Sequence, residues 1–376
     1  MPVLILSVGN YFNPNILFPR RSMQSYFEKT LFLLVAAVLS ACATTSVEET
    51  GQKYWPPAPE IPRVVFETTL KNSASLQIRE AMDEFHSFAT GELSTQTESF
   101  AKPYDVAAYG GLVVVSDSLL GVVHAFDINR KRVFAIGWRG EGRLVKPLGV
   151  AIDDKQNIYI ADGGLGFVVK YDKLGHFLAT IGKREDFSRI SDVAVSNKTG
   201  EVFVVDRGGV ESLDHRVLVY FADGRKQQII GRRGLADGEF NHPAQIAVDD
   251  DGWLYVLDAG NFRVQIFNEQ KEFVRHWGRI GKNLGNFARP RGIAVNQDKY
   301  VFVTDGAFQN YQIFNREGQL LLNVGAGGGK DLPGNYMLPS GIAVDETNRI
   351  YVVDQVRRKV EVFRLLTDEE IVELGK

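Results

Sequence analysis

The chain has 376 residues, 44% hydrophobic and 24% charged, with 37 glycines and 11% aromatic residues; this composition is globular and favours strands joined by tight turns. With 43 basic and 46 acidic residues the formal net charge is -3, which argues against a polyanion-binding protein. Cys42 is the single cysteine, so an intrachain disulfide and a thiolate metal cluster are both excluded.

The first predicted element is a lipoprotein signal peptide over residues 1–41. Leu31–Leu39 is an unbroken apolar stretch, long enough for a signal-peptide core and too short to span a membrane. The tetrapeptide that ends at Cys42 (LSAC) resembles the bacterial lipobox. This resemblance implies cleavage before Cys42 and covalent lipidation of its thiol, by palmitate or a similar acyl chain. A plain signal peptide with a small-residue cleavage site is the alternative.

The true start and the location of the chain depend on the same segment. A start at Met23 gives a compact signal peptide, whereas a start at Met1 gives an extended leader that carries Arg20 and Arg21. Ala43 replaces the aspartate that is associated with inner-membrane retention. The lipobox resemblance therefore implies a lipid anchor in the outer membrane, with the protein facing the periplasm or the exterior. Residues 42–60, polar and then proline-rich, are expected to form a tether.

Residues 61–100 are expected to hold one strand and one helix. Arg63–Leu70 (RVVFETTL) has the composition of a strand. Ser75–Ala89 carries apolar residues at near-helical spacing and is followed by Gly91, so it predicts a short amphipathic helix. The apolar positions are Leu76, Ile78, Met82, Phe85 and Phe88.

From residue 101 onward the sequence repeats at intervals of about 45 to 50 residues. Six apolar strands end in an aspartate, at Asp117, Asp162, Asp206, Asp258, Asp305 and Asp354. An aromatic residue closes the next strand, at Phe126, Tyr171, Tyr220, Phe267, Phe314 and Phe363. Each unit opens at a proline, replaced by Ile190 in the third, and a bulky apolar residue three positions earlier predicts a plug between units. These residues are Phe100, Leu144, Phe187, Phe240, Phe287 and Tyr336.

Four short strands in each unit predict an all-β, six-bladed β-propeller with four-stranded antiparallel blades. Units such as the one around Ala244–Phe267 (AQIAVDDDGWLYVLDAGNFRVQIF) resemble NHL repeats, and the resemblance covers residues 101–366. It is similar to bacterial six-bladed propeller lipoproteins, which implies a fold and a location but no reaction. Because the sixth unit lacks a fourth strand before the tail 367–376, Arg63–Leu70 is expected to supply it and close the ring.

The residues that could carry chemistry have structural interpretations. The six strand-end aspartates are predicted to accept N–H bonds from the following turn. Asp249–Gly252 aligns with hairpin turns and lacks the glutamate of an EF-hand, and the run 325–330 (GAGGGK) lacks the spacing of a phosphate loop. The histidines fall at unrelated points of the repeat, so no metal or cofactor is predicted. They are His86, His124, His176, His215, His242 and His276.

The loops between second and third strands supply a candidate partner surface on units five, six, one and two. This candidate arc is Leu120, Val122, Leu165, Phe167, Phe308, Asn310, Arg357 and Lys359. Its apolar flanks and basic centre favour protein docking, and the alternative is that these side chains pack against neighbouring units. The sequence thus predicts a non-catalytic binding or assembly module in an envelope protein complex, without nucleic acid. A metal-dependent lyase or lactonase acting in the propeller channel is the competing interpretation.

Overall fold

The computed structural model describes residues 53–72, 75 and 99–375. All of them belong to one compact unit, Gly51–Lys376. The predicted signal peptide, Cys42 and nearly all of the predicted helix over 75–89 lie outside the described residues.

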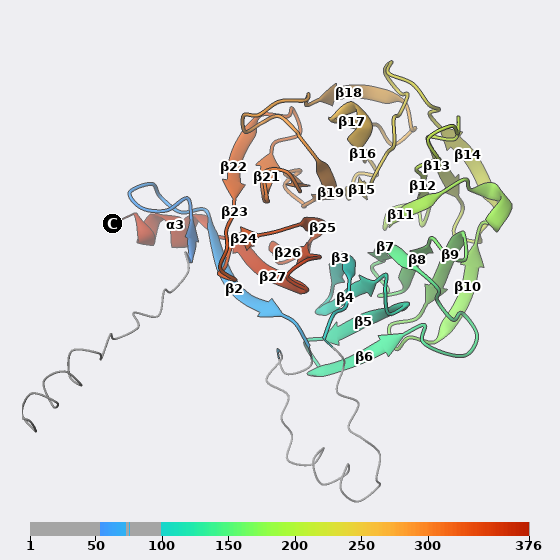
Figure 1. Ribbon diagram of the computed structural model, residues 1–376, viewed down its shortest axis with the longest axis horizontal. Coiled ribbons are helices and arrows are strands. Elements are labelled where there is room, and N and C mark those ends of the chain that lie inside the picture. The colour runs from blue at the N-terminus through green and yellow to red at the C-terminus, as the bar shows by residue number, and fades with distance from the viewer. Residues whose placement is uncertain (1–52, 73–74, 76–98, 376) are drawn as a thin grey trace, which may run out of the picture. The chain divides into compact units, whose positions relative to one another are not determined.

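Six antiparallel sheets form the blades of a propeller, and the first strand of each blade lies nearest the centre (Figure 1). The six-bladed fold predicted from the repeat is confirmed. The innermost strands are β3 (Pro103–Tyr109), β7 (Pro147–Ile152), β11 (Ile190–Val195), β15 (Ile246–Val248), β19 (Pro290–Val295) and β25 (Pro339–Val344). The second strands are β4 (Leu112–Asp117), β8 (Ile158–Asp162), β12 (Val202–Asp206), β16 (Leu254–Asp258), β20 (Val301–Asp305) and β26 (Arg349–Asp354).

The third strands end at the repeated aromatic residues or just beyond them, and the fourth strands form the outside of the ring. The third strands are β5 (Val122–Asp127), β9 (Phe167–Tyr171), β13 (Arg216–Tyr220), β17 (Arg263–Phe267), β21 (Asn310–Phe314) and β27 (Lys359–Leu365). The fourth strands of blades one to five are β6 (Arg132–Ile136), β10 (Phe177–Ile181), β14 (Lys226–Ile230), β18 (Phe273–Trp277) and β22 (Leu320–Val324). Short connecting elements are β23 (Ala326–Gly327), β24 (Asn335–Tyr336), and the 3-10 turns η2 (Arg184–Asp186) and η3 (Ala259–Asn261).

The blades are held together by apolar side chains that fill the space between adjacent sheets. One such core joins Val114 and Ala125 of blade one to Ile160 and Val169 of blade two, all of them fully buried. The predicted plug residues lie in these seams, and all but the half-buried Phe187 are buried. Gly137 shows why a glycine ends the fourth strand: its φ is +79°, and a Cβ there would lie 2.4 Å from the Leu144 side chain.

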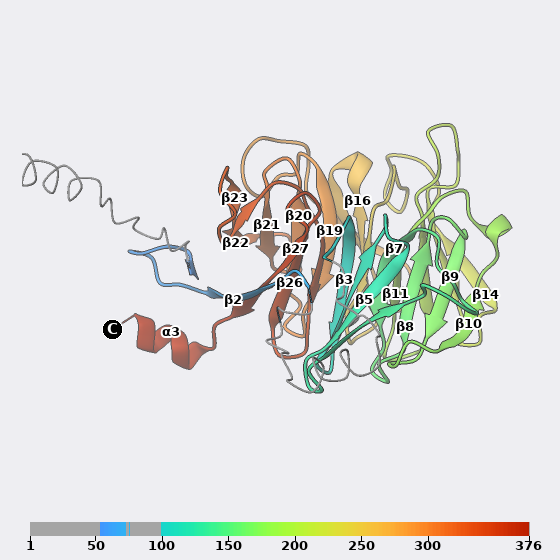
Figure 2. The ribbon, with the colours of Figure 1, turned by 60° about the horizontal axis from the view of Figure 1, so that its bottom comes forward.

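The N-terminal strand closes the ring, as predicted. β2 (Val64–Leu70) pairs antiparallel with β27 on the outside of blade six (Figure 2). A strand within the predicted tether was not expected: β1 (Tyr54–Trp55) pairs with β2. The tether prediction is wrong at this point because Trp55 is buried against Phe363, with ring centroids 5.3 Å apart, and the apolar ring adds to the core of blade six.

The C-terminal tail ends in helix α3 (Asp368–Leu374), which the sequence analysis did not predict. Thr367 caps it: its Oγ1 accepts from the Glu370 amide, and the Glu370 carboxylate accepts from the Thr367 amide, so the first turn is a capping box. Figures 1 and 2 both show α3 outside the ring of blades, beyond β2. None of the described helices is long and apolar enough to cross a membrane.

Candidate functional site

Each blade presents two kinds of connection, and these define two faces of the propeller. The loops after the second strands and the linkers between blades lie at one end of the strands, which we call the loop face. The hairpin turns lie at the opposite end, the turn face. Because binding residues in propellers come from connections rather than from the buried strands, each face is considered in turn.

The six strand-end aspartates fasten the loop face. Asp162 accepts backbone N–H bonds from Val145 and Lys146 in the preceding linker, at 2.7 and 2.9 Å, and from Gly164 and Leu165 in the following loop. Asp117, Asp305 and Asp354 repeat this pattern. Asp206 accepts from three amides, whereas Asp258 accepts from one amide and from the Asn261, Arg263 and Gln265 side chains. All six are fully buried. Their carboxylate oxygens therefore hold the loops and linkers in place by accepting these hydrogen bonds.

The structure does not bring the eight residues of the candidate arc together on one exposed surface. Only Leu120 is exposed, while Asn310 and Lys359 are buried and the other five are half-buried. Leu165 and Phe167 pack against the core between blades one and two. The expected basic centre is neutralised because Lys359 Nζ lies 2.7 Å from Asp331 Oδ1 and also pairs with Glu361. Arg357, with 8% of its side chain exposed, lies among Asp331 and Asp354.

Other apolar side chains of the loop face are exposed, and the sequence analysis missed them. They are Leu119, Trp138, Val145, Val210, Leu213, Leu235, Ile280, Leu284, Met337 and Val356. Most lie in the linkers or in the blade-three insertion, outside the loop positions compared for the candidate arc. Val210, Leu213 and Leu235 are 69%, 76% and 76% exposed. Arg233 ties the first two to the linker, since its Nη1 donates to Val210 O at 2.7 Å and its amide to Leu213 O.

The third residue of each unit forms a polar layer around the axis. The six residues are Asp105, Gly149, Asp192, Gln245, Gly292 and Gly341. The three residues of this layer with polar side chains each bond to the next blade. Asp105 accepts from the Val150 amide at 3.0 Å, Asp192 from the Ile246 amide at 2.8 Å and Gln245 from the Ile293 amide at 3.1 Å. The glycines make room, since a Cβ at Gly149 would lie 2.0 Å from Asp192 Oδ1 and one at Gly341 would lie 2.2 Å from Asp105 Oδ1.

Asp105 and Asp192 form a coupled pair within this layer. Their carboxyl groups are hydrogen-bonded to each other, and Gln245 also bonds to Asp105. Burial raises the pKa of both groups, and the charge of Asp105 raises the pKa of Asp192 further. The pair therefore retains a proton to higher pH than an exposed aspartate does.

The loop end of the axis is basic. The residue before the unit start is a cation or a histidine in five blades: Lys102, Lys146, Arg189, His242 and Arg289. Arg207 and Arg291 lie further in and are half-buried. No carboxylate among the described residues pairs with Arg189, Arg207, Arg289 or Arg291, in contrast to Arg216 and Arg263 of the same face. Burial lowers the pKa of His242, and His215 and three arginines, Arg207 among them, lower it further.

The histidines do not assemble a metal site in the described part of the chain. His215 and His242 stack with ring centroids 4.5 Å apart, but His215 Nδ1 already accepts the His242 amide. His176 and His276 each pair with a single aspartate, and His86 lies outside the described residues. The described residues contain no group of three histidine, cysteine, aspartate or glutamate side chains placed to bind a metal. The axial carboxylates, bonded to amides, do not fit a divalent cation either.

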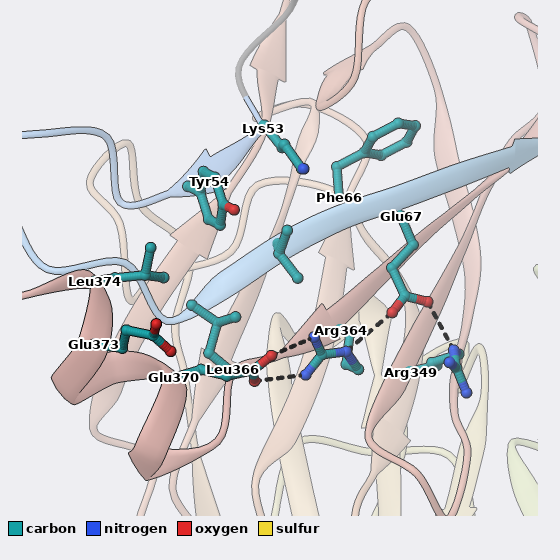
Figure 3. A pocket seen from close by; sticks show the side chains of 11 residues that line it. Lys53, Tyr54, Phe66, Glu67, Arg349, Arg364, Leu366, Glu370, Glu373 and Leu374 are labelled. Atoms are coloured by element: carbon teal, nitrogen blue, oxygen red, sulfur yellow. Dashed lines mark hydrogen bonds and ion pairs between the residues drawn. The ribbon is translucent and has the colours of Figure 1, made fainter.

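A groove of about 680 Å³ lies between β1, β2 and α3 (Figure 3). Four of its charged side chains pair with one another. Glu67 of β2 accepts from Arg349 Nε at 2.7 Å and from Arg364 Nε at 3.0 Å, and Arg364 also makes a two-pronged contact with Glu370 of α3. Hydrogen bonds from Arg364 lower the pKa of Glu370. The network joins the helix to the closing strand, and these four charges are therefore engaged within the protein.

Sequence comparisons find an NHL repeat and relatives that contain it. The family model described as "NHL repeat" matches residues 240–267. Human NHL repeat-containing protein 3 is 29% identical over 137 residues, which cover 33% of this chain and 39% of that protein. The chain thus spans about two fifths of the length of this curated relative. The matched NHL repeat lies in blade four, so the family match concerns the propeller.

Solved structures with the same fold include enzymes. A streptogramin B lyase aligns with a TM-score of 0.53 at 12% identity, over 71% of this chain and 94% of that chain. A gluconolactonase from Xanthomonas campestris aligns with a TM-score of 0.52 at 18% identity, over 71% and 87%. At such identities the likeness shows the fold alone. The chain is a six-bladed β-propeller that contains an NHL repeat and has NHL-repeat relatives.

Proposed function

We propose that this chain is a non-catalytic binding module of the bacterial cell envelope, anchored by a lipid on Cys42, and that its loop face docks a protein partner. The docking proposal rests on the exposed apolar side chains of the loop face, together with cations there that pair with no carboxylate of the described residues. Exposed apolar patches bordered by polar groups are typical of protein interfaces. A partner segment that combines apolar and acidic side chains complements this face.

The patch formed by Val210, Leu213 and Leu235 is the centre of the proposed interface. All three side chains are highly exposed, so they can be changed without opening the core. Arg233 holds their loops together through two backbone carbonyls, which gives the patch a fixed shape before binding. A preformed patch binds with less loss of conformational entropy than a flexible one.

The docking proposal predicts that Val210→Ser, Leu213→Ser and Leu235→Ser together reduce crosslinking to the partner in native envelopes by at least tenfold. The matched control combines Ile128→Ser and Leu174→Ser, exposed apolar residues of the turn face, and should leave the crosslinked product unchanged. Equal yields from both variants, with unchanged denaturation midpoints, would refute the proposed interface.

The competing function is a metal-dependent lyase or lactonase. Two solved structures with the same fold are a lyase and a lactonase. The docking proposal predicts that the purified protein contains no stoichiometric zinc or calcium by elemental analysis. Dialysis against a chelator should then leave its thermal midpoint unchanged, because no bound metal stabilises the fold. Near-stoichiometric metal, lost on chelation, would favour the enzyme instead.

A further inference from the structure

Two positions of the repeat lie at the loop end of the axis: the residue after the unit start and the residue after the strand-end aspartate. In five blades the residues just before them pair in register, as Pro103 does with Asp117. In blade four the Ala244 amide instead donates to Leu257 O, next to Asp258. The six pairs are Tyr104 and Ser118, Leu148 and Gly163, Ser191 and Arg207, Ala244 and Ala259, Arg291 and Gly306, and Ser340 and Gln355. Large residues face small ones: a Cβ on Gly306 would lie 2.9 Å from Arg291 Cδ. Each blade thus contributes at most one long side chain.

Blade four contributes none, and the side chains on either side of it are arginines. Arg207 comes from blade three and Arg291 from blade five, while blade four supplies only Ala244 and Ala259. His242, which opens the same linker, is close enough to Arg207 for that charge to lower its pKa. The two guanidinium groups therefore flank the position with the least side-chain bulk at this end of the axis.

Both arginines have unused hydrogen-bonding capacity. The Nε atoms of Arg207 and Arg291 are buried without a hydrogen-bond partner among the described residues, and so is Nε2 of Gln355. Within the described part of the chain, the side chain of Arg291 makes one hydrogen bond, a long one of 3.4 Å from Nη2 to Gln355 Oε1. Neither guanidinium pairs with a carboxylate of the described chain. A buried donor without a partner costs free energy, more so when the group is charged.

The charges around the two arginines also favour binding of an anion. Burial lowers the pKa of Arg291, and the nearby charges of Arg289 and Arg207 add to this effect. Tyr104 faces the same arginines, whose charges lower its pKa against the larger effect of burial. Arg207, Arg289 and Arg291 repel one another. An anion bound between Arg207 and Arg291 would reduce this repulsion and would also accept hydrogen bonds from their unpartnered N–H groups.

We propose that Arg207 and Arg291 form a binding site for a small oxyanion, a carboxylate or phosphate group, seated over Ala244 and Ala259 of blade four. The planar guanidinium matches the two oxygens of such a group and binds it through paired N–H bonds. The side chains of Ala244 and Ala259 carry no acceptor that would compete with such an anion for the guanidinium groups. This site is separate from the Val210, Leu213 and Leu235 patch, and it does not depend on the docking proposal.

The test is calorimetric titration of the purified full-length protein with inorganic phosphate and, separately, with citrate, at constant ionic strength set by sodium chloride. Saturable binding with one of the anions identifies the preferred group, and binding of both supports the shared oxyanion chemistry. Arg207→Gln and Arg291→Gln should each weaken binding at least tenfold. The control Arg143→Gln removes the same charge from an exposed position of the loop face and should leave the affinity within twofold.

A second readout covers the case in which a variant does not fold. In the wild-type protein, the Nε–Hε resonances of Arg207 and Arg291 should shift saturably during the same titrations. The absence of saturable binding for both anions, or an equal loss of affinity in Arg143→Gln, would overturn the proposal. Because the anion titration does not involve the protein partner, its failure would refute the anion site without bearing on the docking proposal.

Discussion

At the residue scale, the most unusual feature is the Asp105 and Asp192 pair on the axis. Both carboxyl groups are buried, hydrogen-bonded to each other and to backbone amides, and both have a raised pKa. The folded chain therefore keeps a proton that the unfolded chain releases above pH 4 or so. Since the unfolded state then binds fewer protons, the contribution of this pair to stability falls as the pH rises.

Replacing Asp192 with Asn tests this linkage. The asparagine side chain cannot ionise, yet it can still accept a hydrogen bond from the Ile246 backbone N–H and donate one to Asp105. Relative to the wild type, the free energy of unfolding of Asp192→Asn should rise by about 1–3 kcal/mol between pH 4 and pH 8, measured by urea denaturation. Asp154→Asn, at an exposed turn, controls for the loss of one charge. If the difference in free energy of unfolding between Asp192→Asn and the wild type does not change with pH, the two aspartates do not share a proton.

At the element scale, the closing strand is part of the core. Leu70 of β2 is 2% exposed and packs with Val353 and Val360 of blade six. α3 is attached through charged groups instead, with Glu67 and Arg364 as the links. The two terminal elements therefore contribute differently, because buried apolar area is worth more than an ion pair near the surface.

Leu70→Ala should lower the free energy of unfolding by about 2–5 kcal/mol, since it leaves a cavity beside blade six. Leu178→Ala, an exposed position of outer strand β10, serves as the matched control and should change stability by about 0.5 kcal/mol or less. Both values come from guanidinium denaturation followed by far-ultraviolet circular dichroism. Similar midpoints for the two variants would mean that the ring is stable without its closing strand.

The sequence predicts the elements better than the site, and the reason is physical. The strands and the closing role of 63–70 follow from local alternation and from a missing fourth strand. The burial of Lys359 does not, because its partner Asp331 comes from a linker with no repeat to align. Lys359 and Glu361 lie two residues apart on one strand, so their pairing could have been foreseen.

The axial residues show the same limit. Asp105 and Asp192 occupy the position held by glycine in three other units, which is visible once the units are aligned. That they meet each other across the axis depends on the curvature of the closed ring, which no single unit contains. The structure thus adds contacts between units to a pattern that was already present within each unit.

At the scale of the whole molecule, the small net charge conceals two different faces. Cations without a carboxylate partner among the described residues gather at the loop end of the axis, whereas the hairpins of the turn face carry both carboxylates, such as Asp154, Asp250 and Asp298, and cations such as Lys155 and Lys299. An anionic partner is therefore attracted more strongly to the loop end, and this orients the encounter before contact. The composition alone indicates neutrality because it sums over both faces.

The pairing of β2 with β27 also determines the order in which the molecule can fold. Glu67 and Arg364, which bridge the two strands, lie 297 residues apart in the sequence. During synthesis from the N-terminus, β2 can pair with the two-residue strand β1 but waits for β27 until nearly the whole propeller has emerged. Contacts of such long sequence separation form late and slowly. Ring closure is then the final kinetic step, and a chain stopped short of β27 exposes two strand edges open to aggregation.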